Sequence, residues 1–248
     1  MENKMVINWY DSLDSTSDEL RRQIDKLDNL SVIAAREQTA GRGQRGNRWF
    51  SKPGENLTFS FLLKFSPFVL PVPESGLLSF LTSLTVRDFL IGNGVAAVVK
   101  WPNDVYCGRK KICGILIENI FEGSYVAASI IGVGINIGQT VFDNVVNATS
   151  LKLQTGKDLP VEPALVRFCE LLSSRLPLIY SAEGRERMRL DYLNGLFQKD
   201  MACHYHDIRE GMDFIGTLSD VTPQGRAVLM KEDGSESIYD FKEISYIL

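Results

Sequence analysis

The pattern of apolar and polar positions predicts a mixture of strands and helices over the first two thirds of the chain. Strongly apolar, β-branched or aromatic runs predict strands at residues 6–10, 31–38, 57–65, 96–100, 112–119 and 125–137. The sequence Thr16-Ser17-Asp18-Glu19 has the form of a capping box, and the apolar spacing after it predicts a helix. A second helix is predicted from Pro73 to about Gly92, where apolar residues recur every three or four positions.

The remaining third changes in character. A polar, turn-rich segment at 143–160 predicts a loop, and two helices are predicted at 162–180 and 183–198. From about Cys203, short strand-like runs alternate with the turns Pro223-Gln224-Gly225 and Glu232-Asp233-Gly234. This pattern predicts a main domain at residues 1–200 and a small β domain, barrel or sheet, at 201–248.

Composition then narrows the class of protein. The 248 residues are 44% hydrophobic and 23% charged, which is ordinary for a soluble globular protein, and no apolar run is long enough to span a membrane. No signal-peptide pattern precedes the first strand, so a cytoplasmic location is the default expectation. The four cysteines form no Cys-x-x-Cys pair, which predicts reduced thiols. Cys203, His204 and His206 are close in sequence, but their spacing is more typical of ordinary strand residues than of a metal site.

A loop rich in glycine and arginine is the first candidate for chemistry. It reads Gly41-Arg42-Gly43-Gln44-Arg45-Gly46-Asn47-Arg48-Trp49 in a chain whose formal net charge is −4. Glycine permits close backbone approach to a ligand, and arginine presents a planar fork that suits phosphate or carboxylate. The match to a dinucleotide fingerprint is weak, because Pro53 and Gly54 argue against a helix opening at the last glycine. A solvated basic turn is the other interpretation, and the acidic balance argues against a nucleic-acid site.

A second constellation follows some fifty residues later. Lys100-Trp101-Pro102-Asn103-Asp104 is followed by the segment 110–118, which begins with Lys110 and Lys111. One interpretation is a hairpin with both lysines in solvent. The other is a functional turn, because Asn103 and Asp104 would sit at the end of a buried strand.

Together these segments resemble the biotin protein ligases. The resemblance rests on residues 14–16, 38, 41–49, 100–104, 111–114 and 132–136 in this order, and extends in organisation over the whole chain. The chain resembles the ligase-only form of this family, which has no N-terminal DNA-binding domain. Lipoate and octanoate ligases or transferases share that fold but have different loop signatures.

The resemblance implies a fold and an activity. The implied fold is α+β, similar to the class II aminoacyl-tRNA synthetase core, with a mixed β-sheet, flanking helices and a small C-terminal Src-homology-3-like β-barrel. The implied enzyme activates biotin with ATP and Mg²⁺ as biotinyl-5′-AMP. It then transfers biotin to a lysine of a biotin carboxyl carrier domain. No DNA or membrane partner is expected, and the chain would be a monomer or a weak homodimer.

The resemblance also implies roles for individual residues. The catalytic set is Lys111, Arg42 and Asp104, where Asp104 orients or deprotonates the incoming lysine. The biotin-binding positions are Ser15, Thr16, Ser17, Gln38, Gly41, Arg42, Gly43, Gln44, Lys111 and Gly114. The ATP- or adenylate-binding positions are Arg42, Arg45, Trp49, Lys100, Asn103, Lys111 and Asn136. No protein metal ligand is expected, since Mg²⁺ would be held mainly by the nucleotide.

Two positions depart from the pattern. Some members of the family have arginine where this chain has Gln44 and Asn47. Ser15 and Thr16 could also serve simply as helix caps, and Trp49 could pack in the core rather than on adenine. The smaller loop charge leaves open how tightly an adenylate would be retained.

Overall fold

A mixed β-sheet forms the frame of the protein. The computed structural model describes residues 5–66, 70–143 and 147–247. Within this part the sheet has eight strands, in the order β1-β2-β3-β8-β7-β6-β5, with β4 beside β8. Its strands are β1 (Val6–Leu13), β2 (Ser31–Gln38), β3 (Leu57–Lys64), β4 (Leu70–Pro71), β5 (Ala97–Lys100), β6 (Asp104–Cys107), β7 (Lys110–Glu122) and β8 (Tyr125–Ile135). Only β1 and β2 run parallel among these pairs.

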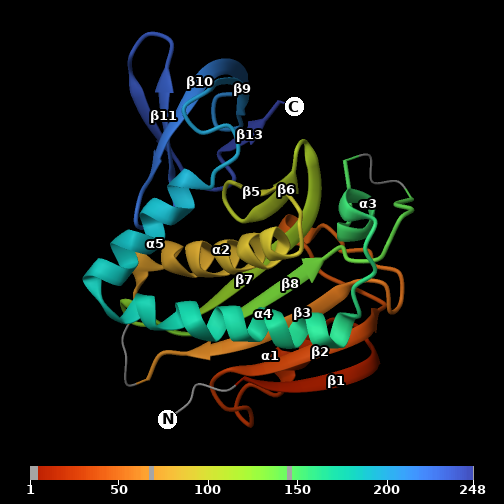
Figure 1. The fold of residues 1–248 in the computed structure, drawn as a ribbon. Helices are drawn as coiled ribbons and strands as arrows, with labels where there is room; N and C mark the ends of the chain where they lie inside the picture. Colours follow the sequence, from red (N-terminus) through yellow and green to blue (C-terminus); the bar gives the residue numbers. More distant parts are fainter. Residues whose placement is uncertain (1–4, 67–69, 144–146, 248) are drawn as a thin grey trace.

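Helices cover both faces of this sheet. Helix α1 (Thr16–Arg22) packs on one face, against β2, β3 and β8. Helices α2 (Gly76–Gly92) and α4 (Val161–Arg175) lie across the other face, and α5 (Ala182–Asn194) packs on α2 (Figure 1). The arrangement is the α+β fold expected from the sequence.

Strand β3 shows why the two faces differ. Phe59 and Phe61 point to the face covered by α2 and α4. The Phe168 ring of α4 lies 4.9 Å from the Phe59 ring, centroid to centroid. Leu62 points to the other side and packs with Leu20 of α1. Between them Ser60 faces α1, because successive side chains of a strand alternate between faces. An apolar run that is buried on both faces therefore supplies a core on one side and a polar position on the other.

Most of the expected elements are confirmed, but the helices expected at 162–180 and 183–198 end earlier and some elements were not foreseen. The segment 143–160 was expected to be a loop but contains α3 (Leu151–Thr155), whose N-terminus is capped by the Ser150 hydroxyl; positions 144–146 lie outside the described residues. The helix expected to run to residue 180 ends at Arg175 and continues as a 3₁₀ turn, Leu176–Tyr180, which contains Pro177. Helix α5 ends at Asn194 and not at 198, and strand β6 was not foreseen.

A second, smaller sheet follows α5. Its strands are β9 (Ala202–Asp207), β10 (Met212–Val221), β11 (Ala227–Lys231), β12 (Glu236–Tyr239) and β13 (Ile244–Tyr246). They pair in the order β12-β11-β10-β9-β13, and among the described residues this path does not close into a barrel. Both turns expected here are confirmed, with Gly225 and Gly234 at φ of 88° and 82°. The sheet docks on the main one through Trp101, whose indole N–H donates to the Gly225 carbonyl at 2.8 Å.

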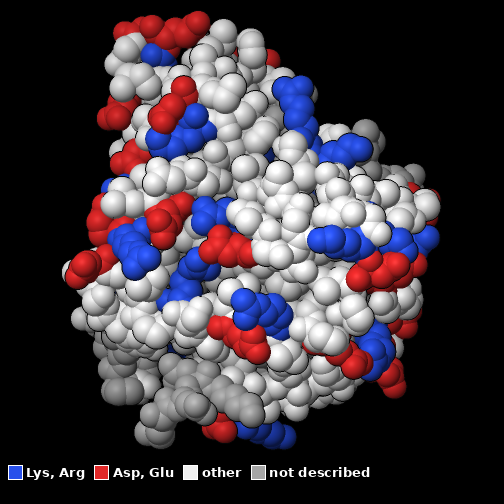
Figure 2. Space-filling model, viewed as in Figure 1, with Lys and Arg blue, Asp and Glu red and all other residues white. Residues whose placement is uncertain are grey.

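The surface alternates in charge over the helices. Figure 2 shows lysine and arginine interspersed with aspartate and glutamate on the face that carries α4 and α5. Pairs one helical turn apart contribute to this pattern, such as Arg167 with Glu170 and Arg189 with Glu186. No helix in the described part of the chain is long and apolar enough to cross a membrane.

All four cysteines are free thiols, and burial raises the pKa of Cys113 well above its usual range. Across the described ranges no three His, Cys, Asp or Glu side chains gather in a way that could hold a metal ion. His206 instead pairs with Asp213 across the β9–β10 ladder, at 2.6 Å from Nδ1 to Oδ1.

Candidate active site

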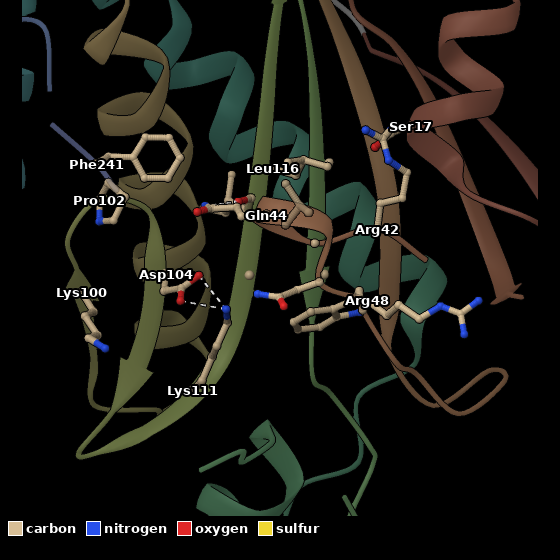
Figure 3. A pocket seen from close by; sticks show the side chains of 18 of the residues that line it. Ser17, Arg42, Gln44, Arg48, Lys100, Pro102, Asp104, Lys111, Leu116 and Phe241 are labelled. Atoms are coloured by element: carbon tan, nitrogen blue, oxygen red, sulfur yellow. Dashed lines mark hydrogen bonds and ion pairs between the residues drawn. The ribbon is translucent and has the colours of Figure 1, made fainter. Parts of the chain in front are cut away.

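A cavity of about 350 Å³ collects segments that are far apart in the sequence. It opens where the N-terminus of α1, the end of β2, the glycine-rich loop and strands β5 to β8 meet (Figure 3). Its walls include twelve of the residues assigned from the sequence: Ser15, Thr16, Ser17, Gln38, Arg42, Gly43, Gln44, Trp49, Lys100, Asp104, Lys111 and Gly114. The fold thus brings the two sequence constellations onto one site.

The glycine-rich loop lies folded against the sheet. Arg42 and Arg48 form an antiparallel bridge at its base, and residues Gln44–Gly46 form a 3₁₀ turn. The Gln44 amide donates to the Asn103 side-chain oxygen at 2.6 Å and to the Ile115 carbonyl at 3.0 Å. Because the chain is extended from Asn47 onward, no α-helix opens at the last glycine, and the dinucleotide interpretation is excluded.

The Arg42 side chain is held by two carboxylates. Its guanidinium donates to Asp18 of α1 at 2.5 Å and to Glu118 of β7 at 2.7 Å. These contacts, with the Glu118 hydrogen bond the largest cause, raise the pKa of Arg42. In Figure 3 Arg42 lies beside Ser17, whereas Arg48 points away from the centre of the cavity.

Glycines form the floor beneath Trp49. Gly114 of β7 and Gly134 of β8 are partners in the sheet register, and the Trp49 ring lies on both. A Cβ atom at Gly134 would stand 2.3 Å from Cε2 of Trp49, and one at Gly114 would stand 2.9 Å from its Cζ3. The Trp49 indole nitrogen is buried without a hydrogen-bond partner in the described structure. The ring therefore covers the floor while its polar atom remains available to an acceptor.

Across the cavity from Lys111, and beside Arg42, lies a cluster of buried hydroxyls (Figure 3). The Ser60 hydroxyl of β3 is 2.8 Å from that of Thr16 and 2.9 Å from that of Ser17. The Gln38 side-chain oxygen accepts from the Thr16 backbone N–H at 2.8 Å. Ser15 caps α1, so the helix-cap role expected for it is confirmed. Such a cluster can donate to and accept from a neutral polar ring.

Strands β5 to β7 supply the other polar wall. The Lys111 ammonium is paired with the Asp104 carboxylate at 2.7 Å, and both side chains are about one-third exposed or less (Figure 3). Lys100, the last residue of β5, also lines the cavity. Burial lowers the pKa of Lys100, against the opposing effect of the Asp104 carboxylate and with a smaller contribution from the Lys111 ammonium.

Four assigned residues are not on the cavity wall. Asn103 is buried beneath it, where its amide donates to the Ile115 carbonyl at 3.0 Å. Asn136 is buried too and donates to the Thr149 carbonyl at 2.9 Å. Gly41 packs under the Trp49 backbone and borders two neighbouring hollows, and the side chain of Arg45 lies outside the described residues.

Sequence reasoning missed several participants. Ser60 is hidden within an apolar strand, and its polar character was the one available signal. Gly132 faces Ser17, where a Cβ atom would stand 2.7 Å from the Ser17 hydroxyl. The small sheet also reaches the cavity, through residues Phe241, Lys242, Ile244, Ser245 and Tyr246.

Comparisons with known proteins show which family the chain resembles. Residues 9–136 match the model of the biotin/lipoate A/B protein ligase family. A biotin–[acetyl-CoA-carboxylase] ligase of Paracoccus denitrificans is 29% identical over 232 residues, which are 87% of this chain and 94% of the relative. The bifunctional ligase/repressor of Escherichia coli is 36% identical over 144 residues, 57% of this chain and 44% of that protein, so the match spans less than half of the longer relative.

A solved structure extends the likeness to the fold. The biotin protein ligase of Aquifex aeolicus in complex with biotin and ATP superposes with a TM-score of 0.79 at 26% identity, covering 96% of this chain and 97% of that one. The mixed α+β architecture is therefore that of a biotin protein ligase catalytic domain. With the family model matching more than half of its residues, this chain belongs to the biotin/lipoate A/B protein ligase family.

Proposed function

We propose that this chain is an ATP-dependent ligase that activates biotin as biotinyl-5′-AMP and transfers it to a lysine of a biotin carboxyl carrier domain. The observation that carries the proposal is the composition of one cavity. The hydroxyl cluster around Ser60 lies on one side of a glycine floor, and Lys111 lies on the other. A ureido ring needs paired donors and acceptors, and two reacting anions need cations.

The first step joins two anions. A biotin carboxylate oxygen forms a bond to the α-phosphorus of ATP, and the bond from that phosphorus to pyrophosphate breaks. We assign Lys111 to the carboxylate and the α-phosphate, where its ammonium stabilises charge that develops in the transition state. Arg42 and backbone N–H groups of the glycine-rich loop hold the adenylate phosphate, once Arg42 exchanges Asp18 and Glu118 for the ligand.

The second step uses the acceptor lysine. Its amine forms a bond to the biotinyl carbonyl carbon, the bond from that carbon to the phosphate oxygen breaks, and AMP leaves while the amine loses a proton. We assign Asp104 to orient the amine or take this proton, and the position of its carboxylate on the cavity wall beside Lys111 supports this assignment. Trp49 packs on the adenine ring, and Asn103 and Asn136 support that half of the site from beneath.

Magnesium enters with its nucleotide in this scheme. The described residues offer no group of three His, Cys, Asp or Glu that could hold a metal, so the phosphate oxygens of ATP would supply most of its ligands. Bound there, Mg²⁺ would neutralise phosphate charge.

The assembly around this site is also part of the proposal. We place the catalytic domain at residues 1–200 and the small domain at 201–248. The five antiparallel strands support a Src-homology-3-like topology for the latter. The partner is a carrier domain of a biotin-dependent carboxylase, as the names of the relatives suggest, with no DNA partner and a monomer or weak homodimer as the working state.

Isotope exchange tests the proposal. Purified protein with MgATP is offered biotin, lipoate or octanoate, and incorporation of labelled pyrophosphate into ATP is measured. We expect exchange with biotin alone. Exchange with lipoate or octanoate but not biotin would assign the chain to the other branch of its family.

A further inference from the structure

The cavity wall contributed by the small sheet includes an aromatic clamp on Lys100. The Lys100 ammonium lies 4.7 Å from the ring centroid of Tyr246 in β13 and 4.9 Å from that of Tyr106 in β6. Its Nζ also donates to the Tyr106 hydroxyl at 3.4 Å. One ring comes from each sheet, so the clamp spans the junction between them.

Lys100 differs from Lys111 and Arg42 in its partners. Lys111 is paired with Asp104, and Arg42 with two carboxylates. No carboxylate of the described residues lies within 4.0 Å of the Lys100 ammonium. Aromatic faces stabilise a cation without cancelling its charge, so this ammonium can still attract an anion in the cavity.

The two rings are themselves fixed by further rings. Phe197 lies 6.0 Å from Tyr106 and 6.4 Å from Tyr246, centroid to centroid. The Tyr205 ring of β9 lies 5.0 Å from that of Tyr246, centroid to centroid. This packing restrains the position of Tyr246 relative to the main sheet, and with it the position of the ammonium between the rings.

We propose that Tyr246 is a positioning residue for the first step: with Tyr106 it fixes the Lys100 ammonium, which binds the phosphate chain of ATP. The inference rests on the proposed function and deepens it. It makes the small sheet part of the nucleotide half of the site, so that adenylation depends on β13. A ligand of this kind is an anion with several charges, for which a compact, immobilised ammonium is suited.

Three variants measured by biotin-dependent pyrophosphate exchange test the role of the ring. Tyr246→Leu removes the ring, and we expect the KM for ATP to rise about tenfold, equivalent to about 1.4 kcal/mol, while the KM for biotin stays unchanged. Tyr246→Phe keeps the ring face and should restore the KM for ATP. Tyr239→Leu is the matched control, because Tyr239 is a buried ring of the same sheet that does not line the cavity.

A double mutant separates positioning from a general structural effect. If Tyr246 acts through Lys100, the variant carrying both Tyr246→Leu and Lys100→Met should have the same KM for ATP as Lys100→Met alone. The inference would be overturned if the increases in the KM for ATP caused by Tyr246→Leu and Lys100→Met multiply in the double variant. It would also be overturned if Tyr239→Leu raises this KM as much as Tyr246→Leu does. A wild-type KM for ATP in Tyr246→Leu would overturn it too.

Substitution by fluorinated phenylalanine keeps the test valid if Tyr246→Leu does not fold. Tyr246→pentafluorophenylalanine has nearly the shape of Tyr246→Phe but reverses the charge distribution of the ring face. We expect its KM for ATP to exceed that of Tyr246→Phe about tenfold. Equal values would refute the clamp, whereas wild-type protein without biotin-dependent exchange would refute the proposed function itself.

Discussion

Arg42 and Glu118 form an ion pair, 2.7 Å from Nη2 to Oε1. The residue proposed to hold the adenylate phosphate is therefore also paired with a carboxylate of β7, and the two anions would compete for it. Both side chains are partly exposed, and such pairs contribute at most about 1 kcal/mol. The exchange of partners is thus a small energetic step that mutation can shift.

The first prediction concerns this exchange. Glu118→Gln should lower the KM for ATP in pyrophosphate exchange about two- to fivefold, because Arg42 is held less strongly in the free state. Glu162→Gln, which removes the ion pair with Arg36 outside the cavity, should leave the KM unchanged. A higher KM in Glu118→Gln would show that the carboxylate supports binding instead of competing with it.

The second prediction concerns Lys111. Lys111→Ala should reduce the exchange rate roughly 10²- to 10³-fold, since it removes a cation aimed at charge that develops in the transition state. Thermal unfolding should show a folded protein. Lys110→Ala is the matched control. Lys110 is the exposed neighbour of Lys111 and does not line the cavity, so this variant should keep wild-type activity. Undiminished exchange in Lys111→Ala would remove this residue from the mechanism.

The third prediction concerns the glycine floor. Gly134→Ala places a methyl group 2.3 Å from Trp49, so the indole ring must move. We expect the KM for ATP, measured by titrating pyrophosphate exchange with nucleotide, to rise at least tenfold. The protein should also lose some stability, because the displaced ring must repack. Gly92→Ala has open space around its new methyl group and should leave the KM unaltered. A wild-type KM for Gly134→Ala would mean that the ring position does not matter for the nucleotide.

The fourth prediction concerns pH. The Arg22 guanidinium, together with the Ser15 backbone N–H, lowers the pKa of Asp14 to about 2. A lowered pKa stabilises the fold above the ordinary value near 4, and this contribution disappears as the pH falls from about 4 to about 2. Asp14→Asn should therefore lower the Tm by at most about 4 °C at pH 6, and the difference from wild type should shrink as the pH falls from about 4 to about 2.

Thermal unfolding from pH 2 to pH 7 measures this difference directly. Asp11→Asn is a suitable control, because Asp11 has a fully exposed side chain and its contact with Arg36 is long, at 3.4 Å. A Tm difference for Asp14→Asn that stays constant across the range would contradict the assignment of its stabilising effect to ionisation.

The sequence predicted those parts of the fold and site whose signals are local. Apolar spacing located α2, and the glycines and arginines of the loop at 41–49 marked it as a non-helical, cationic segment. Likewise Lys111 and Asp104 share one short segment, so their proximity followed from the chain itself. Boundaries failed where a single side chain decided them, as with the Ser150 cap of α3.

The remaining parts of the site depend on long-range packing. Ser60 joins the site only when β3 pairs with β8 and is covered by α1, because this packing places its hydroxyl between those of Thr16 and Ser17. Tyr246 reaches Lys100 only because the small sheet docks beside β5 and β6. Neither contact has a signature in neighbouring residues.

The alternation along β3 limits which insertions and deletions the gene can tolerate. Loss of one residue within this strand would shift the following side chains to the opposite face. Phe61 would then point toward α1 and the hydroxyl cluster, while Leu62 would point toward the core formed with α2 and α4. Deletion of a single residue before Phe61 in β3 should therefore abolish activity as fully as a change to Lys111, even though it removes none of the charged groups of the cavity.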